Sequence, residues 1–241
     1  MRRPNWIRPA ILPQHAREIE HGPLFLHLCS QISKAYAFEG FLSNEISRLR
    51  ATRLPVLPRM TWIEAMVQTE IGPAQASVAL TAPNKPGTPM HWLTSGLRSL
   101  DGDINRLSDH ATPQLTGSVD PQNWLNYAQI FCATIRENRA LFTLCTCFDT
   151  LTALSRINPR QKAALREVFA PPRWIEAEIE APRVAEVVIA YGQRLARAHL
   201  TLHENGRFEM LEEIEIGRLP PPRYVAGPKN WIYRRKDLND D

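Results

Sequence analysis

Residues 120–169 read DPQNWLNYAQIFCATIRENRALFTLCTCFDTLTALSRINPRQKAALREVF, and this stretch decides the fold prediction. Asp120-Pro121 and Asn158-Pro159 each place an N-cap residue before a proline at the first helical position. At that position the missing N–H costs nothing and φ is already set for a helix. We therefore predict helices along this stretch, each with an apolar face that needs partners. The apolar residues at helical spacing are Trp124, Ala128, Phe131, Ile135, Leu141, Leu144, Cys145, Phe148, Leu151, Ala164, Leu165, Val168 and Phe169.

Composition is that of an ordinary globular protein. The chain has 241 residues, of which 44% are hydrophobic and 22% charged. A chain of this length buries about 70% of its unfolded surface, so its core needs no disulfides. Met1-Arg2-Arg3 is not followed by the apolar run of a signal peptide, and no apolar run approaches a membrane span of about 18 residues. We expect a soluble, cytoplasmic protein that is not bound to a membrane.

Charge sets only broad bounds on function. The net charge is +4 and the isoelectric point is about 9.0, which permits an acidic partner without requiring one. Only five of the 29 basic residues are lysine. This arginine bias is typical of a GC-rich genome, and we interpret the chain as bacterial.

The N-terminal half is predicted to be rich in helices. Pro23 begins a helix with Leu24, Leu28 and Ile32 on its inward face, and residues 41–50 continue it. Two strands are predicted next, at 61–69 and 76–81, joined by a Gly72-Pro73 turn, although Thr61 and Glu64 also fit a helix start. A helix then begins after Thr94 or Ser95 and carries Leu97, Leu100, Ile104 and Leu107.

The C-terminal third changes to the alternating pattern of strands. Apolar and polar residues alternate at 175–180 and again at 196–203, and Asn205-Gly206 is a strong hairpin signal. Residues 184–193 fit a helix or a strand, and their Val-Val-Ile run favours a strand. The prediction is an α+β fold with a helix-rich N-terminal and central part and an antiparallel sheet formed largely by the C-terminal third. One domain, 1–241, carries extended proline-rich arms at about 1–13 and 217–241.

Metal and nucleotide sites are not expected. Cys132, Cys145 and Cys147 offer three thiols to a soft metal, but no second matching pair completes a zinc motif. Small buried hydrophobes are the more usual role of such cysteines. His15 and His21 flank Glu18 on a segment too short for a stable helix. Glycine-rich phosphate loops and the serine elbow of hydrolases are absent from the sequence, so we predict neither a metal nor a cofactor.

The strand that carries His199 and His203 is the first place to expect an active site. With Arg197 and with the glutamates at 176, 178 and 180, these histidines offer groups for proton transfer near neutral pH. Ordinary cross-strand charge pairs explain the same pattern. The catalytic residues of such an unrecognised enzyme stay unknown from the sequence.

The two arms combine cations with aromatic residues, which are the residue types that anchor interfaces. The leading hypothesis is therefore a non-enzymatic accessory protein that binds another protein or a second copy of itself. Binding of nucleic acid through phosphate contacts and base stacking is the alternative. We expect deletion of residues 220–241 to weaken assembly and leave the fold intact. The candidate interface residues are Arg2, Arg3, Trp6, Arg8, Arg223, Tyr224, Lys229, Trp231, Tyr233, Arg234 and Arg235.

Overall fold

The structure is a computed structural model of the whole chain. The residues that it describes are 6–8, 10, 12–35, 46–55, 57–81, 91–94, 121–137, 140–175, 184–203, 208–227 and 231–237.

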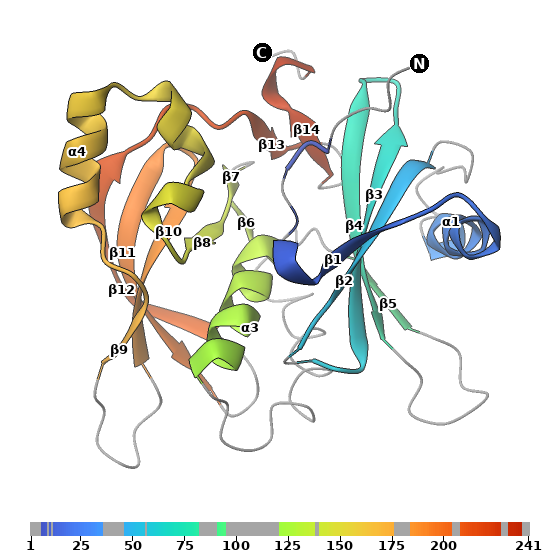
Figure 1. Cartoon of the computed structure of the whole chain (residues 1–241), viewed down its shortest axis with the longest axis horizontal. Coiled ribbons are helices and arrows are strands. Elements are labelled where there is room, and N and C mark those ends of the chain that lie inside the picture. Colours follow the sequence, from blue (N-terminus) through green and yellow to red (C-terminus); the bar gives the residue numbers. More distant parts are fainter. Residues whose placement is uncertain are drawn as a thin grey trace.

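Two antiparallel sheets organise the chain, and the first, sheet 1, combines N-terminal with C-terminal strands (Figure 1). Its strand order is β1-β2-β3-β4-β14-β13, and β5 also pairs with β4. The strands are β1 (Ala16–Ile19), β2 (Ile46–Arg53), β3 (Met60–Gln68), β4 (Pro73–Thr81), β5 (His91–Thr94), β13 (Tyr224–Ala226) and β14 (Ile232–Arg234).

The second sheet, sheet 2, has the order β12-β11-β10-β8, with β9 also paired with β10. A separate two-stranded ribbon, β6 with β7, lies between α3 and β8 in the sequence. The strands are β6 (Arg136–Glu137), β7 (Ala140–Leu141), β8 (Thr143–Cys145), β9 (Arg173–Ile175), β10 (Val184–Tyr191), β11 (Arg194–Leu202) and β12 (Phe208–Arg218).

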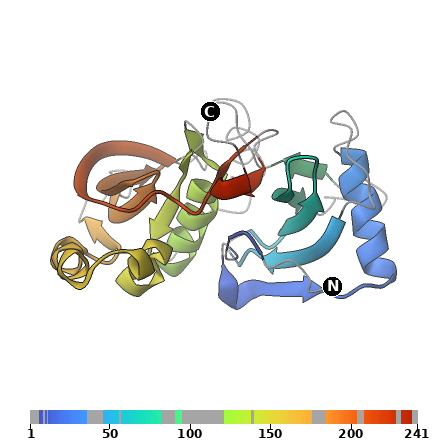
Figure 2. The same ribbon diagram turned by 90° about the horizontal axis from the view of Figure 1, so that it is seen from above.

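The three α-helices of the described residues form layers that alternate with the sheets. In both views α1 lies on the outer face of sheet 1, α3 lies between the sheets, and α4 lies beyond sheet 2 (Figures 1 and 2). Among the described residues none of these helices is long and apolar enough to cross a bilayer. The helices are α1 (Pro23–Ala35), α3 (Pro121–Thr134) and α4 (Pro159–Val168), and the short 3₁₀ helices are η1 (Pro13–His15), η4 (Phe148–Thr150), η5 (Thr152–Arg156) and η7 (Arg235–Asp237).

The largest hydrophobic cluster joins both sheets through α3. Phe208 of β12 contacts the rings of Trp124, Tyr127 and Phe131, with centroid distances of 5.1 to 5.3 Å. Trp62 of β3 belongs to the same cluster from the side of sheet 1. Smaller clusters join α1 to the outer face of sheet 1 and α4 to the outer face of sheet 2. This cluster therefore contains residues of both sheets and of α3.

Several local predictions are confirmed. Helices begin at Pro121 and at Pro159, and Asn158 Oδ1 accepts a hydrogen bond of 2.8 Å from the Gln161 N–H. The chain also forms strands on both sides of Gly72, whose φ is 140°, and over 184–191. Helix caps, turns and β-branched runs act over a few neighbouring residues, so they can be recognised without knowledge of the tertiary contacts.

The prediction of a helix-rich N-terminal part is wrong, because this part of the chain supplies most strands of sheet 1. The predicted helical continuation over 41–50 is a strand from Ile46 onwards. Leu49 points to the cluster with α1, while Arg50 is buried on the opposite face beside Glu64. A buried arginine breaks the simple apolar–polar alternation by which a strand is recognised. The predicted position of Leu24 on the inward face of its helix is also wrong, because this side chain is exposed.

The predicted helix over 141–151 is also wrong. This segment holds β7, β8 and η4. Leu144 packs in the cluster around α3, whereas the adjacent Cys145 packs in the cluster around α4. A strand that is buried on both faces lacks alternation and mimics helical spacing.

The predicted helix that carries residues 97–107 and the glutamates at 176, 178 and 180 lie outside the described residues. The strands on both sides of Asn205-Gly206 are described. β11 and β12 pair antiparallel, and the pair nearest to the predicted turn is Leu202 with Phe208.

Candidate functional site: a cavity between the two sheets

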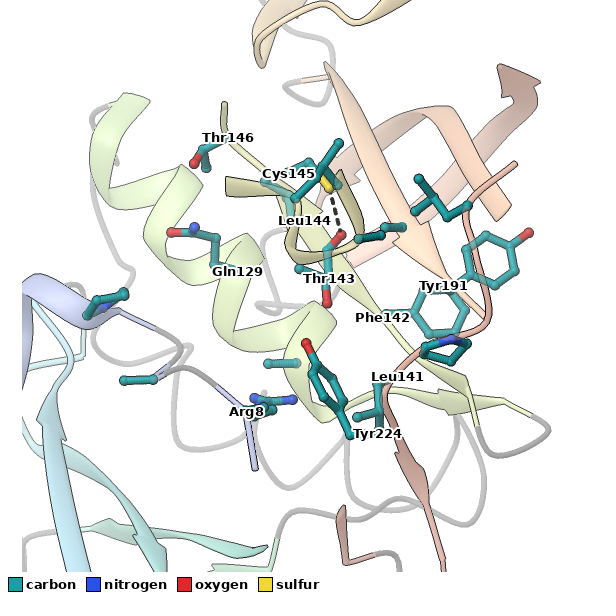
Figure 3. Close-up of a pocket in the computed structure, with 18 of the residues that line it drawn as sticks. Arg8, Gln129, Leu141, Phe142, Thr143, Leu144, Cys145, Thr146, Tyr191 and Tyr224 are labelled. Carbon is teal, nitrogen blue, oxygen red and sulfur yellow. Dashed lines mark hydrogen bonds between the residues drawn. The ribbon is translucent and has the colours of Figure 1, made fainter. Parts of the chain in front are cut away.

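A cavity of about 630 Å³ lies between the two sheets, beside α3 (Figure 3). Its wall is assembled from segments that are far apart in the sequence. They are the N-terminal segment, α3, the run from β7 to η5, the turn after β10 and the proline-rich connection from β12 to β13. The volume suits a small organic molecule, since ligand pockets measure roughly 300–1,000 Å³.

One face of α3 supplies a row of amides to the cavity. Gln122, Asn126 and Gln129 are spaced by four and three residues, which places them on one side of a helix. Gln122 Nε2 donates a hydrogen bond of 3.1 Å to Asn126 Oδ1. Opposite this polar row, the aromatic core residues of α3 face the main cluster. The amide row is visible in the sequence as a polar stripe, and our sequence analysis did not single it out.

Apolar and aromatic side chains form much of the remaining wall. Phe142 stacks on Tyr191 with ring centroids 4.6 Å apart and an angle of 3° between the planes. In Figure 3, Tyr224 lies beside Arg8 on the same side of the cavity as Leu141. Convergent polar groups on an apolar wall are the usual composition of a ligand site.

The charged residues that line the cavity are all arginines. Arg8 comes from the N-terminal segment, Arg156 ends η5, and Arg223 precedes β13. No aspartate or glutamate occurs among the described residues of the wall. Arg156 Nη1 donates a hydrogen bond of 2.6 Å to the carbonyl of Pro221, which ties η5 to the proline-rich connection at the edge of the cavity. The charge of this wall therefore favours anions.

Arg8 belongs to a buried charge network on the inner face of sheet 1. Glu64 is fully buried, with Arg50 Nε at 2.5 Å from one carboxylate oxygen and Gln75 Nε2 at 2.7 Å from the other. Arg8 Nε lies 4.0 Å from Glu64, and the Arg8 carbonyl accepts a hydrogen bond from Arg50. Trp6 covers the network, because its ring lies 4.1 Å from the Arg50 guanidinium.

Burial shapes the electrostatics of Arg8. Only 7% of the residue is exposed. Loss of hydration lowers the pKa of the Arg8 guanidinium, and the nearby Glu64 carboxylate opposes that shift. One carboxylate thus faces two buried guanidiniums, Arg8 and Arg50, and the wall keeps an excess of positive charge.

The cysteine at the cavity wall is a poor nucleophile. Burial raises the pKa of Cys145 to about 12, and it raises the pKa of Cys132 to a similar value. Both thiols are therefore protonated at neutral pH, which suits the predicted packing role. Cys147 is exposed. Across the described residues, no group of three or more His, Cys, Asp or Glu side chains is arranged to hold a metal ion.

The two histidines predicted for catalysis lie away from this cavity, on sheet 2. His199 sits between Glu186, at 3.6 Å, and Glu212, at 3.2 Å, on the neighbouring strands. His203 Nε2 lies 2.8 Å from Glu209. Neither histidine lines the cavity. Their geometry matches cross-strand charge pairs, which the sequence offered as the alternative explanation.

The structure separates the predicted interface residues of the arms into different environments. Trp231 and Tyr233 are buried in the cluster between sheet 1 and α1, and Trp6 is half-buried with Nε1 donating to Glu18 at 2.7 Å. Arg8, Arg223 and Tyr224 line the cavity. Arg234 and Arg235 are half-buried, and the described residues do not include Arg2, Arg3 or Lys229.

Comparisons with protein-family models, with curated proteins and with solved structures find no match to this chain.

Proposed function

We propose that the chain is a small-molecule-binding protein and that its ligand occupies the cavity between the two sheets. The observation that carries the proposal is the size and lining of the cavity. The cavity measures about 630 Å³, and its wall combines apolar and stacked aromatic side chains with a row of amides on one face of α3. Segments from both ends of the chain close around this space, which favours a preformed site.

We propose that the protein binds its ligand without catalysing a reaction. The described residues of the cavity wall include no histidine or carboxylate, and their one thiol, Cys145, is protonated at neutral pH. General acid–base catalysis and thiol catalysis therefore lack an obvious group in the described wall. The proposal keeps the sequence-based hypothesis of a non-enzymatic accessory protein as a hypothesis and replaces its protein partner with a small ligand.

Thr143→Trp tests the proposal. Thr143 is an exposed residue of β8 that lines the cavity, and an indole at this position would occupy the space without removing a core contact. Tryptophan is also well accepted in strands. We expect a metabolite library to contain compounds that raise the melting temperature of the wild type in a concentration-dependent way, as binding to the native state requires. Thr143→Trp should abolish these shifts.

The matched control is Leu211→Trp, on an exposed position of β12 outside the cavity. This variant should show the same increases in melting temperature as the wild type. The cavity would be rejected as the binding site if no compound raises the melting temperature of the wild type, or if the compounds raise that of Thr143→Trp equally.

A second candidate function is protein binding, now through β12 instead of the arms. Met210, Leu211 and Ile214 are each 44–54% exposed on this strand, which is at the edge of sheet 2. Exposed edge strands pair readily with other chains, although register shifts in β12 and its glutamates oppose such pairing. Leu211→Glu should lower the apparent mass in analytical ultracentrifugation if β12 forms an interface; an unchanged mass would remove this candidate.

A further inference from the structure

The balance of charge around the cavity identifies the chemistry of its ligand. On the inner face of sheet 1, Arg8 and Arg50 share the single buried carboxylate of Glu64. Arg50 makes the short contact, and Gln75 occupies the other oxygen of that carboxylate. Arg8 is left with an ion pair of 4.0 Å and no side-chain hydrogen bond to Glu64, although it is nine-tenths buried. Buried cations are costly unless they are paired, so Arg8 needs a further acceptor.

The neighbouring charges do not remove this excess. Glu18 binds Arg48 and Trp6 on the other side of the network. With Arg48 and Glu18 included, the described cluster holds three guanidiniums and two carboxylates. An anion bound in the cavity would give the Arg8 guanidinium a second negatively charged partner, because Arg8 lines the cavity.

Two more arginines lie at the cavity, one at the end of η5 and one directly before β13. Arg156 and Arg223 line the wall, and no ion pair joins either of them to a carboxylate of the described residues. Both residues are exposed, so they keep their hydration until a ligand arrives. Guanidiniums form paired hydrogen bonds with carboxylate and phosphate oxygens, which makes these two groups the matching chemistry.

We infer, on the basis of the proposed function, that the ligand is an organic anion whose carboxylate or phosphate is bound by Arg8, with Arg156 and Arg223 supplying the remaining positive charge. The body of this ligand is apolar or aromatic, because Leu125 and the Phe142–Tyr191 stack line the same cavity. The amides of α3 provide hydrogen bonds to polar atoms of that body.

Matched pairs of probes test the charge requirement by isothermal titration calorimetry on the full chain. Adenosine 5′-monophosphate is compared with adenosine, and 4-hydroxybenzoate with 4-hydroxybenzamide, so that each anion has a neutral counterpart of similar shape. We expect at least one anion to bind at millimolar concentration and its neutral counterpart to bind at least about tenfold more weakly. The pair that responds shows whether the anionic group is phosphate or carboxylate.

Three arginine variants localise the effect. Arg156→Gln and Arg223→Gln change exposed side chains, so these proteins should fold, and each should weaken the binding of the anion by about 3- to 10-fold. Arg8→Gln should weaken it further, with its melting temperature measured to confirm folding. Arg218→Gln, an exposed arginine outside the cavity, should leave the affinity unchanged.

The outcomes separate this inference from the proposed function. If neutral compounds bind as tightly as the anions, or no anion binds, or Arg156→Gln and Arg223→Gln both keep wild-type affinity, the anion inference is overturned. The cavity still stands as a ligand site if Thr143→Trp blocks the binding of a neutral compound. If Thr143→Trp blocks nothing, the proposed function itself fails.

Discussion

At the scale of single residues, Glu64 controls the charge of the cavity wall. Its carboxylate is fully buried and bound by Arg50 and Gln75, with Arg8 at 4.0 Å. A buried ion pair adds little net stability, but removal of one partner leaves the other charge buried without compensation. Here the loss of one carboxylate would strand two guanidiniums.

Glu64→Gln is therefore expected to destabilise the protein by about 3–5 kcal/mol, measured by urea unfolding. Glu18→Gln provides the control, because Glu18 is half-exposed and its ion pair with Arg48 is expected to contribute less than about 1 kcal/mol. Equal losses in the two variants would show that burial does not distinguish these carboxylates.

The sequence does not reveal this network. Arg50 and Glu64 lie in strands, where isolated charges are usually read as residues of a solvated face. The pairing of β2 with β3 places Arg50 opposite Glu64, and Trp6 and Arg8 of the N-terminal segment contact this pair. Burial of a charge is a property of its neighbours, so no local pattern predicts it.

At the scale of elements, α4 combines a local signal with a contact that only the fold creates. Its start at Asn158-Pro159 follows from the sequence, and the side chain of Asn158 caps the helix. Its position on sheet 2 depends on Gly217 of β12. A Cβ atom at Gly217 would lie 2.3 Å from Leu165 Cδ2, so the absence of a side chain there lets the helix approach the strand.

Asn158→Ala is expected to cost about 1 kcal/mol, since alanine leaves the Gln161 N–H without its acceptor. Asn158→Ser keeps an acceptor oxygen at the cap and should stay close to the wild type. Thermal unfolding followed by circular dichroism compares the three proteins. A loss of stability as large in the serine variant as in the alanine variant would contradict the capping role.

The sequence predicts elements well where a strand alternates or carries a run of β-branched residues and where a helix has a cap, and poorly for a short buried strand that has neither signal. β10 and β11 were assigned from Val187-Val188-Ile189 and from alternation, and the structure confirms them. β8 was missed because Leu144 and Cys145 are both buried, on opposite faces. Its partner β10 decides its conformation, through pairs such as Leu144 with Ile189.

At the scale of the whole molecule, the C-terminal segment closes sheet 1. After β12, the chain crosses from sheet 2 to sheet 1, where β14 pairs with β4 (Figure 1). Trp231, Ile232 and Tyr233 are at most 3% exposed. The expectation that residues 220–241 form a detachable arm is therefore replaced by a structural role.

Deletion of residues 220–241 should prevent cooperative folding. It removes β13, β14 and three large buried side chains, each of which contributes about 1.5–3 kcal/mol, against a total stability of roughly 5–15 kcal/mol. Trp231→Ala is the graded version and should cost about 3–5 kcal/mol, whereas exposed Leu211→Ala should change little. Urea unfolding measures all three, and a truncated chain with a wild-type transition would disprove the role of the segment.

The sequence alone determined where helices α1, α3 and α4 begin, that Gly72 separates two strands, and that the chain mixes helices with an antiparallel sheet. These features depend on caps, turns and alternation, whose energies are settled within a few neighbouring residues. The tertiary structure alone decided that β1 joins β13 and β14 in sheet 1, that Arg8 is buried beside Glu64, and that a cavity opens between the sheets. Those features require contacts between residues as distant as Arg8 and Tyr224, and long-range packing is not written in any local pattern.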